Sequence, residues 1–440
     1  MEILIKAGQL ILSLSILIIL HELGHFIPAK IFGARVEKFY LFFDPWFSIF
    51  KFKKGETEYG IGWVPLGGYV KISGMIDESM DKEQLNKPAQ PYEFRSKPAW
   101  QRLIIMLGGV TVNVILAIVI FAMIMFVWGE KYLPNSSVKY GIMCDSVALK
   151  MGLRNGDKII SLDGKPVDRF YAIQADLLIE QPKTIQVERD GQKVEIVIPA
   201  GFVKSALSKG ARGFMAPRFP FEVAAFAPGG VAEKYGIKVG DRLVGINGHP
   251  TYFFDEFKSE LQQYKGKKVS VSALRGKDTV NLNVVVPATG LLGIAPKSDE
   301  SYLAYKTKTY DIISAFPAGL DKAYGTLSAY VKQFKLIFDP QVEGYKHVGG
   351  FITIGNIFPS VWDWESFWGL TAFLSIMLAF MNVLPIPALD GGHAMFTLYE
   401  IITKRKPSDK FLEYAQLGGM ALLFSLLIFA NGNDLFKLFN

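Results

Sequence analysis

The sequence predicts an α-helical polytopic membrane protein with four transmembrane helices, a membrane-associated β-hairpin and two inserted β-rich modules. Half of the 440 residues are hydrophobic, and 34 residues are phenylalanine. Four apolar stretches are each about 20 residues long, which is the length of a helix that crosses a bilayer. Between the second and the third stretch, a glycine-rich pattern occurs twice. Each copy is followed by the alternation of apolar and polar residues that is typical of strands.

Composition limits both the partners and the metal ligands. The formal charge is 48 − 41 = +7, an excess that in a membrane protein indicates basic cytoplasmic loops, so we expect no nucleic-acid partner. The single cysteine, Cys144, excludes an intramolecular disulfide and a cysteine-based zinc site. Any metal ion would therefore be held by histidine and carboxylate side chains.

The four apolar stretches are residues 3–20, 103–128, 367–389 and 411–430. A cleavable signal peptide is the alternative for the first stretch, but Glu2 precedes Lys6 and no small-residue cleavage site follows. The segments that we expect are 1–33 for the first transmembrane helix, 34–102 for a cytoplasmic-side region with a membrane-reentrant β-hairpin, 103–128 for the second helix, 129–203 and 204–298 for the β-rich modules, 299–360 for amphipathic surface helices and a linker, 361–402 for the third helix and 403–440 for the fourth.

Basic residues predict the orientation of the chain. The loop between the first two stretches is basic, and a second cluster lies between the last two stretches, at Lys404, Arg405, Lys406 and Lys410. The positive-inside rule places both loops in the cytoplasm. The β-rich modules would then lie outside the cytoplasm.

Residues 47–63, FSIFKFKKGETEYGIGW, alternate apolar and polar side chains about a Lys-Lys-Gly-Glu turn, which predicts a β-hairpin. The stretch PLGGYVKISG follows it at residues 65–74. Such a hairpin would offer an edge strand that can pair with another extended segment. The alternative is an ordinary cytoplasmic hairpin.

The glycine-rich pattern appears as GLRNGDKIISLDGKPV from Gly152 and as GIKVGDRLVGINGHPT from Gly236, an offset of 236 − 152 = 84 residues. Both copies place glycine where turns require a positive φ. Both resemble PDZ domains, whose grooves take an extended peptide as an added strand. The alternative is that the two modules are spacers.

A helical repeat of apolar residues follows the second module, at Ile313, Phe316, Leu320, Tyr324, Leu327, Val331, Phe334 and Phe338. This stripe predicts an amphipathic helix on the outer membrane surface. In the second apolar stretch, Asn113 is expected to hydrogen-bond between helices rather than to take part in chemistry.

Two histidines and a glutamate interrupt the first apolar stretch in IILHELGHF, residues 18–26. His21 and His25 are four residues apart, so on a helix they lie on one face and could bind the same Zn²⁺ ion. Glu22 lies beside that position, where it could take a proton from the attacking water and pass it to the leaving amine. Three buried polar groups in an apolar span are costly unless they are functional.

The third ligand is sought in FMNVLPIPALDGGHAMF, residues 380–396. Asp390 is an acid that lipid would not tolerate unless it were paired or bound to metal. Pro385 and Pro387 interrupt the helix before it, and such a break is tolerated only against protein or a cavity. Asp390 is therefore the preferred third ligand, with water as the fourth, and His393 is the rival.

Taken together, three features resemble the site-2 protease family, in its bacterial RseP type. They are the H-E-x-x-H motif in the first span, the N-x-x-P-x-P-x-x-D-G motif in a late span, and the two PDZ-like copies between them. The resemblance implies an intramembrane metalloprotease of the bacterial inner membrane with one Zn²⁺, its active site toward the cytoplasm. It implies His21, His25 and Asp390 as ligands, Glu22 as the base, and Asn382 and Pro385 as substrate-contacting residues.

The resemblance also implies single-pass transmembrane substrates, such as an anti-sigma factor, that a site-1 protease has already cut in regulated intramembrane proteolysis. One alternative within proteolysis is the clearance of signal-peptide remnants. An alternative of another class is a non-catalytic scaffold that holds envelope proteins through its PDZ pair.

Overall fold

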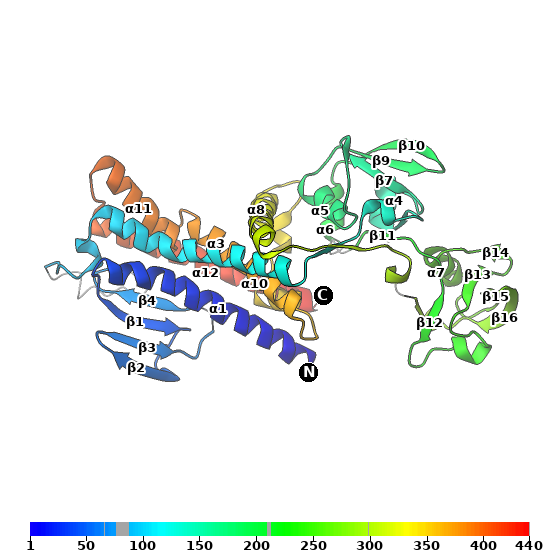
Figure 1. Cartoon of the computed structure of the whole chain (residues 1–440), viewed down its shortest axis with the longest axis horizontal. Coiled ribbons are helices and arrows are strands. Elements are labelled where there is room, and N and C mark those ends of the chain that lie inside the picture. The colour runs from blue at the N-terminus through cyan, green and yellow to red at the C-terminus, as the bar shows by residue number, and fades with distance from the viewer. Residues whose placement is uncertain (66, 76–87, 209–212, 298, 440) are drawn as a thin grey trace. The chain divides into compact units, whose positions relative to one another are not determined.

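The computed structural model describes residues 1–65, 67–75, 88–208, 213–297 and 299–439 (Figure 1). The chain divides into two compact units. The membrane unit comprises Met1–Gly129, Thr309–Phe338 and Tyr345–Asn440, and the β-rich unit comprises Glu130–Lys308 and Asp339–Gly344.

The membrane unit contains the four expected apolar helices. They are α1 (Glu2–Ile31), α3 (Ala99–Val127), α10 (Trp364–Val383) and α12 (Asp409–Phe439). In the described ranges, these four are long and apolar enough to cross a membrane. The prediction of four spans is confirmed.

The third span is shorter than the sequence predicted. We expected one apolar helix over residues 367–389 within a segment of 361–402, but α10 ends at Val383 and a separate helix, α11 (Asp390–Thr403), begins after a short break. Proline cannot continue the hydrogen-bond ladder of a helix, so Pro385 and Pro387 end α10 here. As a result Asp390 is the first residue of a new helix.

Glycines allow α1 and α3 to approach each other at their backbones. A Cβ atom on Gly24 would lie 2.4 Å from the carbonyl oxygen of Gly108, and a Cβ on Gly108 would lie still closer to the Gly24 carbonyl oxygen. Only glycine permits such contact, as is common between membrane helices. This contact brings the H-E-x-x-H segment of α1 directly against α3.

The predicted hairpin is part of a four-stranded sheet with the order β2-β3-β1-β4. Strands β2 (Phe50–Lys54) and β3 (Thr57–Ile61) pair antiparallel, which confirms the hairpin. β1 (Val36–Leu41) pairs parallel with β3 and antiparallel with β4 (Tyr69–Ile72). β4 lies next to α1 and β2 forms the far edge (Figure 1). The edge strand beside the active site is therefore β4, from the stretch after the hairpin, and the expectation that the hairpin supplies it is corrected.

The predicted amphipathic segment forms α8 (Ile312–Ile337). Its small residues face α3, and a Cβ atom on Gly319 would lie 2.5 Å from the backbone nitrogen of Ala122. Of its larger apolar side chains, Ile313 (81%) and Tyr324 (72%) are exposed, whereas Leu327 packs against α3 and the ring of Phe334 lies 5.4 Å from that of Phe380 in α10. Such a surface suits contact with lipid, and its position on the membrane surface stays a prediction.

The β-rich unit contains two modules whose strands follow the same order. The first runs through β6 (Ile142–Cys144), α4 (Ser146–Met151), β7 (Lys158–Leu162), β8 (Lys165–Pro166), α5 (Ala172–Ile179), β9 (Thr184–Arg189), β10 (Gln192–Val197) and β11 (Met215–Pro217). The second runs through β12 (Val223–Phe226), η3 (Ala232–Tyr235), β13 (Arg242–Ile246), β14 (His249–Pro250), α7 (Phe254–Gln262), β15 (Lys268–Arg275), β16 (Asp278–Val285) and β17 (Ile294–Pro296). Each module has a four-stranded sheet, β10-β9-β7-β8 or β14-β13-β15-β16, and a two-stranded ribbon.

The boundary between the modules differs from the expected one. We placed it between residues 203 and 204, but β11 pairs with β6 and so belongs to the first module. The first module therefore extends to Pro217. Its last strand is separated from the rest by α6 (Phe202–Ser208), which hides the pairing from local sequence patterns.

The aspartate of the repeated Gly-Asp pair has the same internal role in each module. Asp241 accepts hydrogen bonds of 2.8 Å from Nε and Nη2 of Arg275, and Arg189 donates to Asp157 in the same way. Burial alone would raise the pKa of Asp241, but the hydrogen bonds from Arg275 and from the backbone of Lys238 hold it below its usual range. The aspartate of the motif thus stabilises the fold of each module.

Candidate active site

Three side chains from distant parts of the chain meet at one point of the membrane unit. The helix α1 carries His21 and His25, both buried, and α11 begins with Asp390. Oδ2 of Asp390 lies 3.3 Å from Nε2 of each histidine, and the two Nε2 atoms are 3.3 Å apart. The structure therefore brings together the three residues that the sequence predicted as metal ligands.

This triangle fits a tetrahedral zinc ion. Bonds of about 2.0–2.1 Å to tetrahedral Zn²⁺ separate neighbouring ligand atoms by about 3.3–3.4 Å, which matches the three distances above. Oδ2 of Asp390 is buried and accepts no hydrogen bond from the described residues, as expected for an oxygen that faces a cation. Two imidazoles and one carboxylate, with a fourth position open to a cavity, form the ligand set of a catalytic zinc site.

The rival ligand His393 is not part of this group. Among the residues that the structure describes, only His21, His25 and Asp390 have ligand atoms within 4.8 Å of one another. His393 lies almost one turn further along α11 and lines the same cavity.

Glu22 lies in the cavity without joining the triangle. The cavity has a volume of about 990 Å³ and is lined by α1, β4, α10 and the start of α11. The carboxylate of Glu22 lies close to the backbone N–H of Val70 in β4, which lines the same cavity. β4 approaches α1 closely because residue 68 is glycine, where a Cβ atom would lie 2.4 Å from Cγ2 of Ile18. Strand and helix together hold Glu22 next to the metal position.

The two predicted substrate-contacting residues are placed differently. Asn382, in the last turn of α10, lines the cavity, and its Nδ2 lies 3.3 Å from Nε2 of His21. Pro385 lies in the break between α10 and α11, is exposed and does not line this cavity. A contact between Pro385 and substrate stays a prediction.

The break before Asp390 is held by close contacts that only glycine permits. A Cβ atom on Gly391 would lie 2.3 Å from the carbonyl oxygen of Leu384, so the segment folds back over the start of α11. From α12, Oε1 of Gln416 accepts a hydrogen bond of 3.1 Å from the backbone N–H of Ala388. The sequence pattern predicted α12 only as an apolar span, and Gln416 was missed because nothing local shows what it faces.

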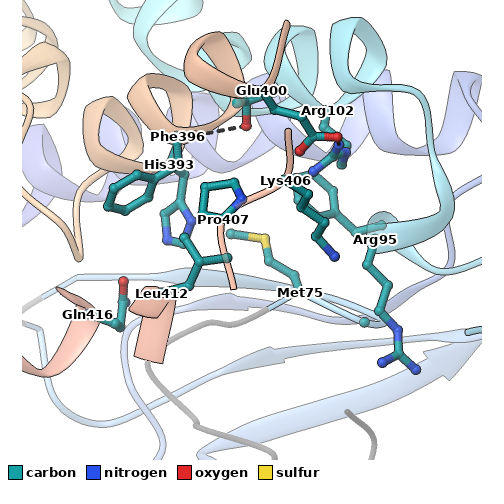
Figure 2. A pocket seen from close by; sticks show the side chains of 13 residues that line it. Met75, Arg95, Arg102, His393, Phe396, Glu400, Lys406, Pro407, Leu412 and Gln416 are labelled. Carbon is teal, nitrogen blue, oxygen red and sulfur yellow. Dashed lines mark hydrogen bonds and ion pairs between the residues drawn. The ribbon is translucent and has the colours of Figure 1, made fainter. Parts of the chain in front are cut away.

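A second cavity of about 710 Å³ adjoins the first and shares Met75, His393 and Gln416 with it (Figure 2). In it, Nη2 of Arg102 in α3 lies 2.6 Å from Oε1 of Glu400 in α11. Both side chains are largely buried, so the pair is screened little by water. This ion pair fixes α11, which starts at Asp390, against α3.

Backbone and side-chain groups of α3 contact the outer nitrogens of both histidines. The carbonyl oxygen of Ile105 lies 2.8 Å from Nδ1 of His25. Nδ2 of Asn113 lies 3.0 Å from Nδ1 of His21. Such contacts orient metal-binding imidazoles. The sequence predicted only a hydrogen bond between helices for Asn113, because the pattern of α3 does not show that its partner is a ligand.

Four apolar helices, a group of two histidines and one aspartate that could hold a metal ion, and an adjacent carboxylate are the features expected of a membrane metalloprotease. The family model of peptidase family M50 matches residues 9–426. The chain belongs to this family, the site-2 proteases, and is a zinc metalloprotease of the inner membrane. The resemblance found in the sequence motifs is confirmed.

Similar proteins cover almost the whole chain. A Neisseria meningitidis protein whose name classes it as a zinc metalloprotease is 28% identical over 97% of this chain and 98% of its own length. Metalloprotease MmpA of Caulobacter vibrioides is 27% identical over 98% of this chain and 96% of its own length. The regulator of sigma E protease of Haemophilus influenzae is 25% identical over the full length of both chains.

Proposed function

We propose that this protease hydrolyses single-pass membrane proteins within or next to the bilayer, with His21, His25 and Asp390 holding one zinc ion and Glu22 acting as the base. The observation that carries the proposal is the triangle of 3.3 Å between Asp390 Oδ2 and the two Nε2 atoms, which opens into the cavity that Glu22 lines.

In this mechanism, the metal when bound supplies a Lewis acid that polarises the scissile carbonyl and acidifies water. Glu22 accepts the proton of the attacking water and then passes it to the amine nitrogen as the C–N bond breaks. The backbone N–H of Val70 lies close to the Glu22 carboxylate and can orient it for both transfers. Asn382 offers an amide in the same cavity, where it can hydrogen-bond to the substrate backbone.

The edge of β4 is suited to hold the substrate in an extended form. β4 pairs with β1 on one side, and no other strand of the described ranges pairs with it. Tyr69, Val70 and Ile72 line the catalytic cavity. A transmembrane helix must unwind before one of its peptide bonds can be cut, and its freed backbone groups then need partners. Strand addition to β4 would supply them.

Disulfide cross-linking tests this binding mode. In a Cys144→Ala, Glu22→Gln background, Val70→Cys should cross-link to a substrate that carries one cysteine near its cleavage site. Phe52→Cys is the matched control, because β2 is the opposite edge of the same sheet. Equal cross-linking at both positions, or none at Val70, would contradict strand addition.

Zinc removal tests the chemistry. Incubation of the purified protein with a zinc chelator should abolish cleavage of a tagged single-pass substrate, and added Zn²⁺ should restore it. The Glu22→Gln variant is the control, since re-added zinc should not activate it. Undiminished cleavage by protein shown to be free of metal would refute a zinc-dependent mechanism.

The physiological substrates are proposed as membrane proteins of the anti-sigma-factor kind, cut first by a site-1 protease. The name of the Haemophilus influenzae relative, regulator of sigma E protease, supports this role. Both modules of the β-rich unit share one order of strands, which supports PDZ-like folds. We place them outside the cytoplasm, where they would exclude substrates with bulky exterior domains.

Clearance of signal-peptide remnants is the second proposed role, because remnants are also short single-span segments that fit the same cavity. Identification of the fragments that accumulate in a Glu22→Gln strain separates the two roles. The scaffold alternative is disfavoured, since a scaffold needs no group of His21, His25 and Asp390 inside the membrane unit.

A further inference from the structure

Asn113 is a buried polar residue in α3, and only one of the two polar atoms of its side-chain amide has a hydrogen-bond partner in the described part of the chain. Its Nδ2 lies 3.0 Å from Nδ1 of His21, and the residue has no solvent exposure (0%). Its Oδ1 is buried as well and has no hydrogen-bond partner in the described part of the chain. A buried acceptor without a partner costs about 1–3 kcal/mol, so the position of Asn113 beside a metal ligand requires an explanation.

The two histidines differ in the group that contacts the outer nitrogen. The carbonyl of Ile105, 2.8 Å from Nδ1 of His25, can only accept a hydrogen bond. His25 therefore carries its proton on Nδ1 and presents a lone pair at Nε2. An asparagine amide has a donor end and an acceptor end, so Asn113 is compatible with either tautomer of His21.

Zinc binding at His21 selects one of these two tautomers. An amide with Nδ2 toward Nδ1 of His21 pairs only with the tautomer that carries its proton on Nε2. Nε2 is the nitrogen that faces the proposed metal position, 3.3 Å from Oδ2 of Asp390. A zinc ion bound at Nε2 requires the opposite tautomer, with the proton on Nδ1.

We propose that Asn113 positions His21 for zinc binding by turning its amide so that Oδ1 accepts the proton on Nδ1. A half-turn about the terminal torsion exchanges Oδ1 and Nδ2 with almost no change in shape. The amide then fixes the ligand tautomer of His21, as the Ile105 carbonyl does for His25. Asn113 is thus a positioning residue, and the proposal rests on the zinc site described under the proposed function.

The backbone of Asn113 is held separately from its side chain. Oγ of Ser375 in α10 donates a hydrogen bond of 2.8 Å to the Asn113 carbonyl oxygen, and Ser375 is also fully buried. Loss of this hydroxyl disturbs the same contact between helices without touching an imidazole. Ser375→Ala is therefore a matched control for side-chain changes at Asn113.

The experiment measures the zinc dissociation constant of the full-length protein in detergent by competition with a chromogenic chelator. Asn113→Leu cannot accept a hydrogen bond and should weaken zinc binding about 10- to 100-fold, whereas Asn113→Asp and Ser375→Ala should stay within about threefold of the wild type. The visible absorption of the cobalt-substituted protein should change in Asn113→Leu and not in Ser375→Ala.

Asn113→Ala also lacks an acceptor, packs readily between membrane helices, and carries the same expectation if the leucine variant does not fold. Wild-type zinc affinity in Asn113→Leu or Asn113→Ala would overturn the proposal. A loss in Asn113→Asp as large as in Asn113→Leu would also overturn it, as would an equal loss in Ser375→Ala, which would indicate helix packing. A wild-type protein that binds no zinc would instead overturn the proposed metal site.

Discussion

Glu22→Gln should lower the rate of substrate cleavage by about 10²- to 10⁴-fold, which is the usual contribution of a general acid–base group. Glutamine has nearly the same shape as glutamate, and its side-chain oxygen keeps an acceptor beside the backbone N–H of Val70. It cannot take a proton from water at neutral pH. Only proton transfer should therefore be lost, with the cavity and the position of β4 unchanged.

The zinc content separates this role from metal binding. Glu22 is outside the group of His21, His25 and Asp390, so Glu22→Gln should retain one zinc ion per chain. Asp390→Asn should instead lose zinc and activity together, because a neutral amide is a much weaker ligand. Glu2→Gln, at the exposed start of the same helix, controls for loss of charge on α1. Wild-type cleavage by Glu22→Gln would show that another group is the base, and loss of its zinc would make Glu22 a ligand.

The sequence predicted the metal group because each member has a local signal. The spacing of His21 and His25 places them on one helix face, and Asp390 is an acid in a stretch too apolar to hold it free. Asp390 is 365 residues from His25 in the sequence (390 − 25). We predicted that these side chains lie together because an unpaired polar side chain in lipid is energetically unfavourable. The proline-interrupted segment before Asp390 also predicted a break, although α10 ends six residues earlier than expected (389 − 383).

The parts that sequence patterns missed depend on contacts between distant segments. Strand alternation predicted β2 and β3, but the parallel pairing of β1 with β3 and the position of β4 at the edge depend on register across the sheet. The roles of Asn113 and Gln416 depend on which helix face meets α1 or the proline break. Asn113 lies four residues after Gly109, and only the packed helices show that both face the imidazoles.

Gly109→Ala should reduce zinc affinity and cleavage by about 10²-fold, since displacement of a reacting group by about 1 Å has effects of this size. A Cβ atom at this position of α3 would lie 2.4 Å from Nε2 of His25 and 2.6 Å from Cε1 of His21. Both distances are below van der Waals contact, so at least one imidazole must leave its place in the triangle with Asp390.

If the imidazoles are displaced in Gly109→Ala, the thermal stability of the protein should not fall although zinc binding and cleavage are reduced. Alanine favours helix over glycine by about 1 kcal/mol, so Gly109→Ala should keep its helical content and unfold at no lower temperature than the metal-free wild type. Gly8→Ala on α1 meets no atom within 4 Å and should leave zinc binding and cleavage unchanged. If Gly109→Ala bound zinc as tightly as the wild type, the face of α3 at Gly109 could not be packed against the ligands, and the contact of Asn113 with His21 would be lost with it. If it failed to fold, the backbone rather than the imidazoles would have yielded, and Gly24 and Gly108 would be the positions under strain.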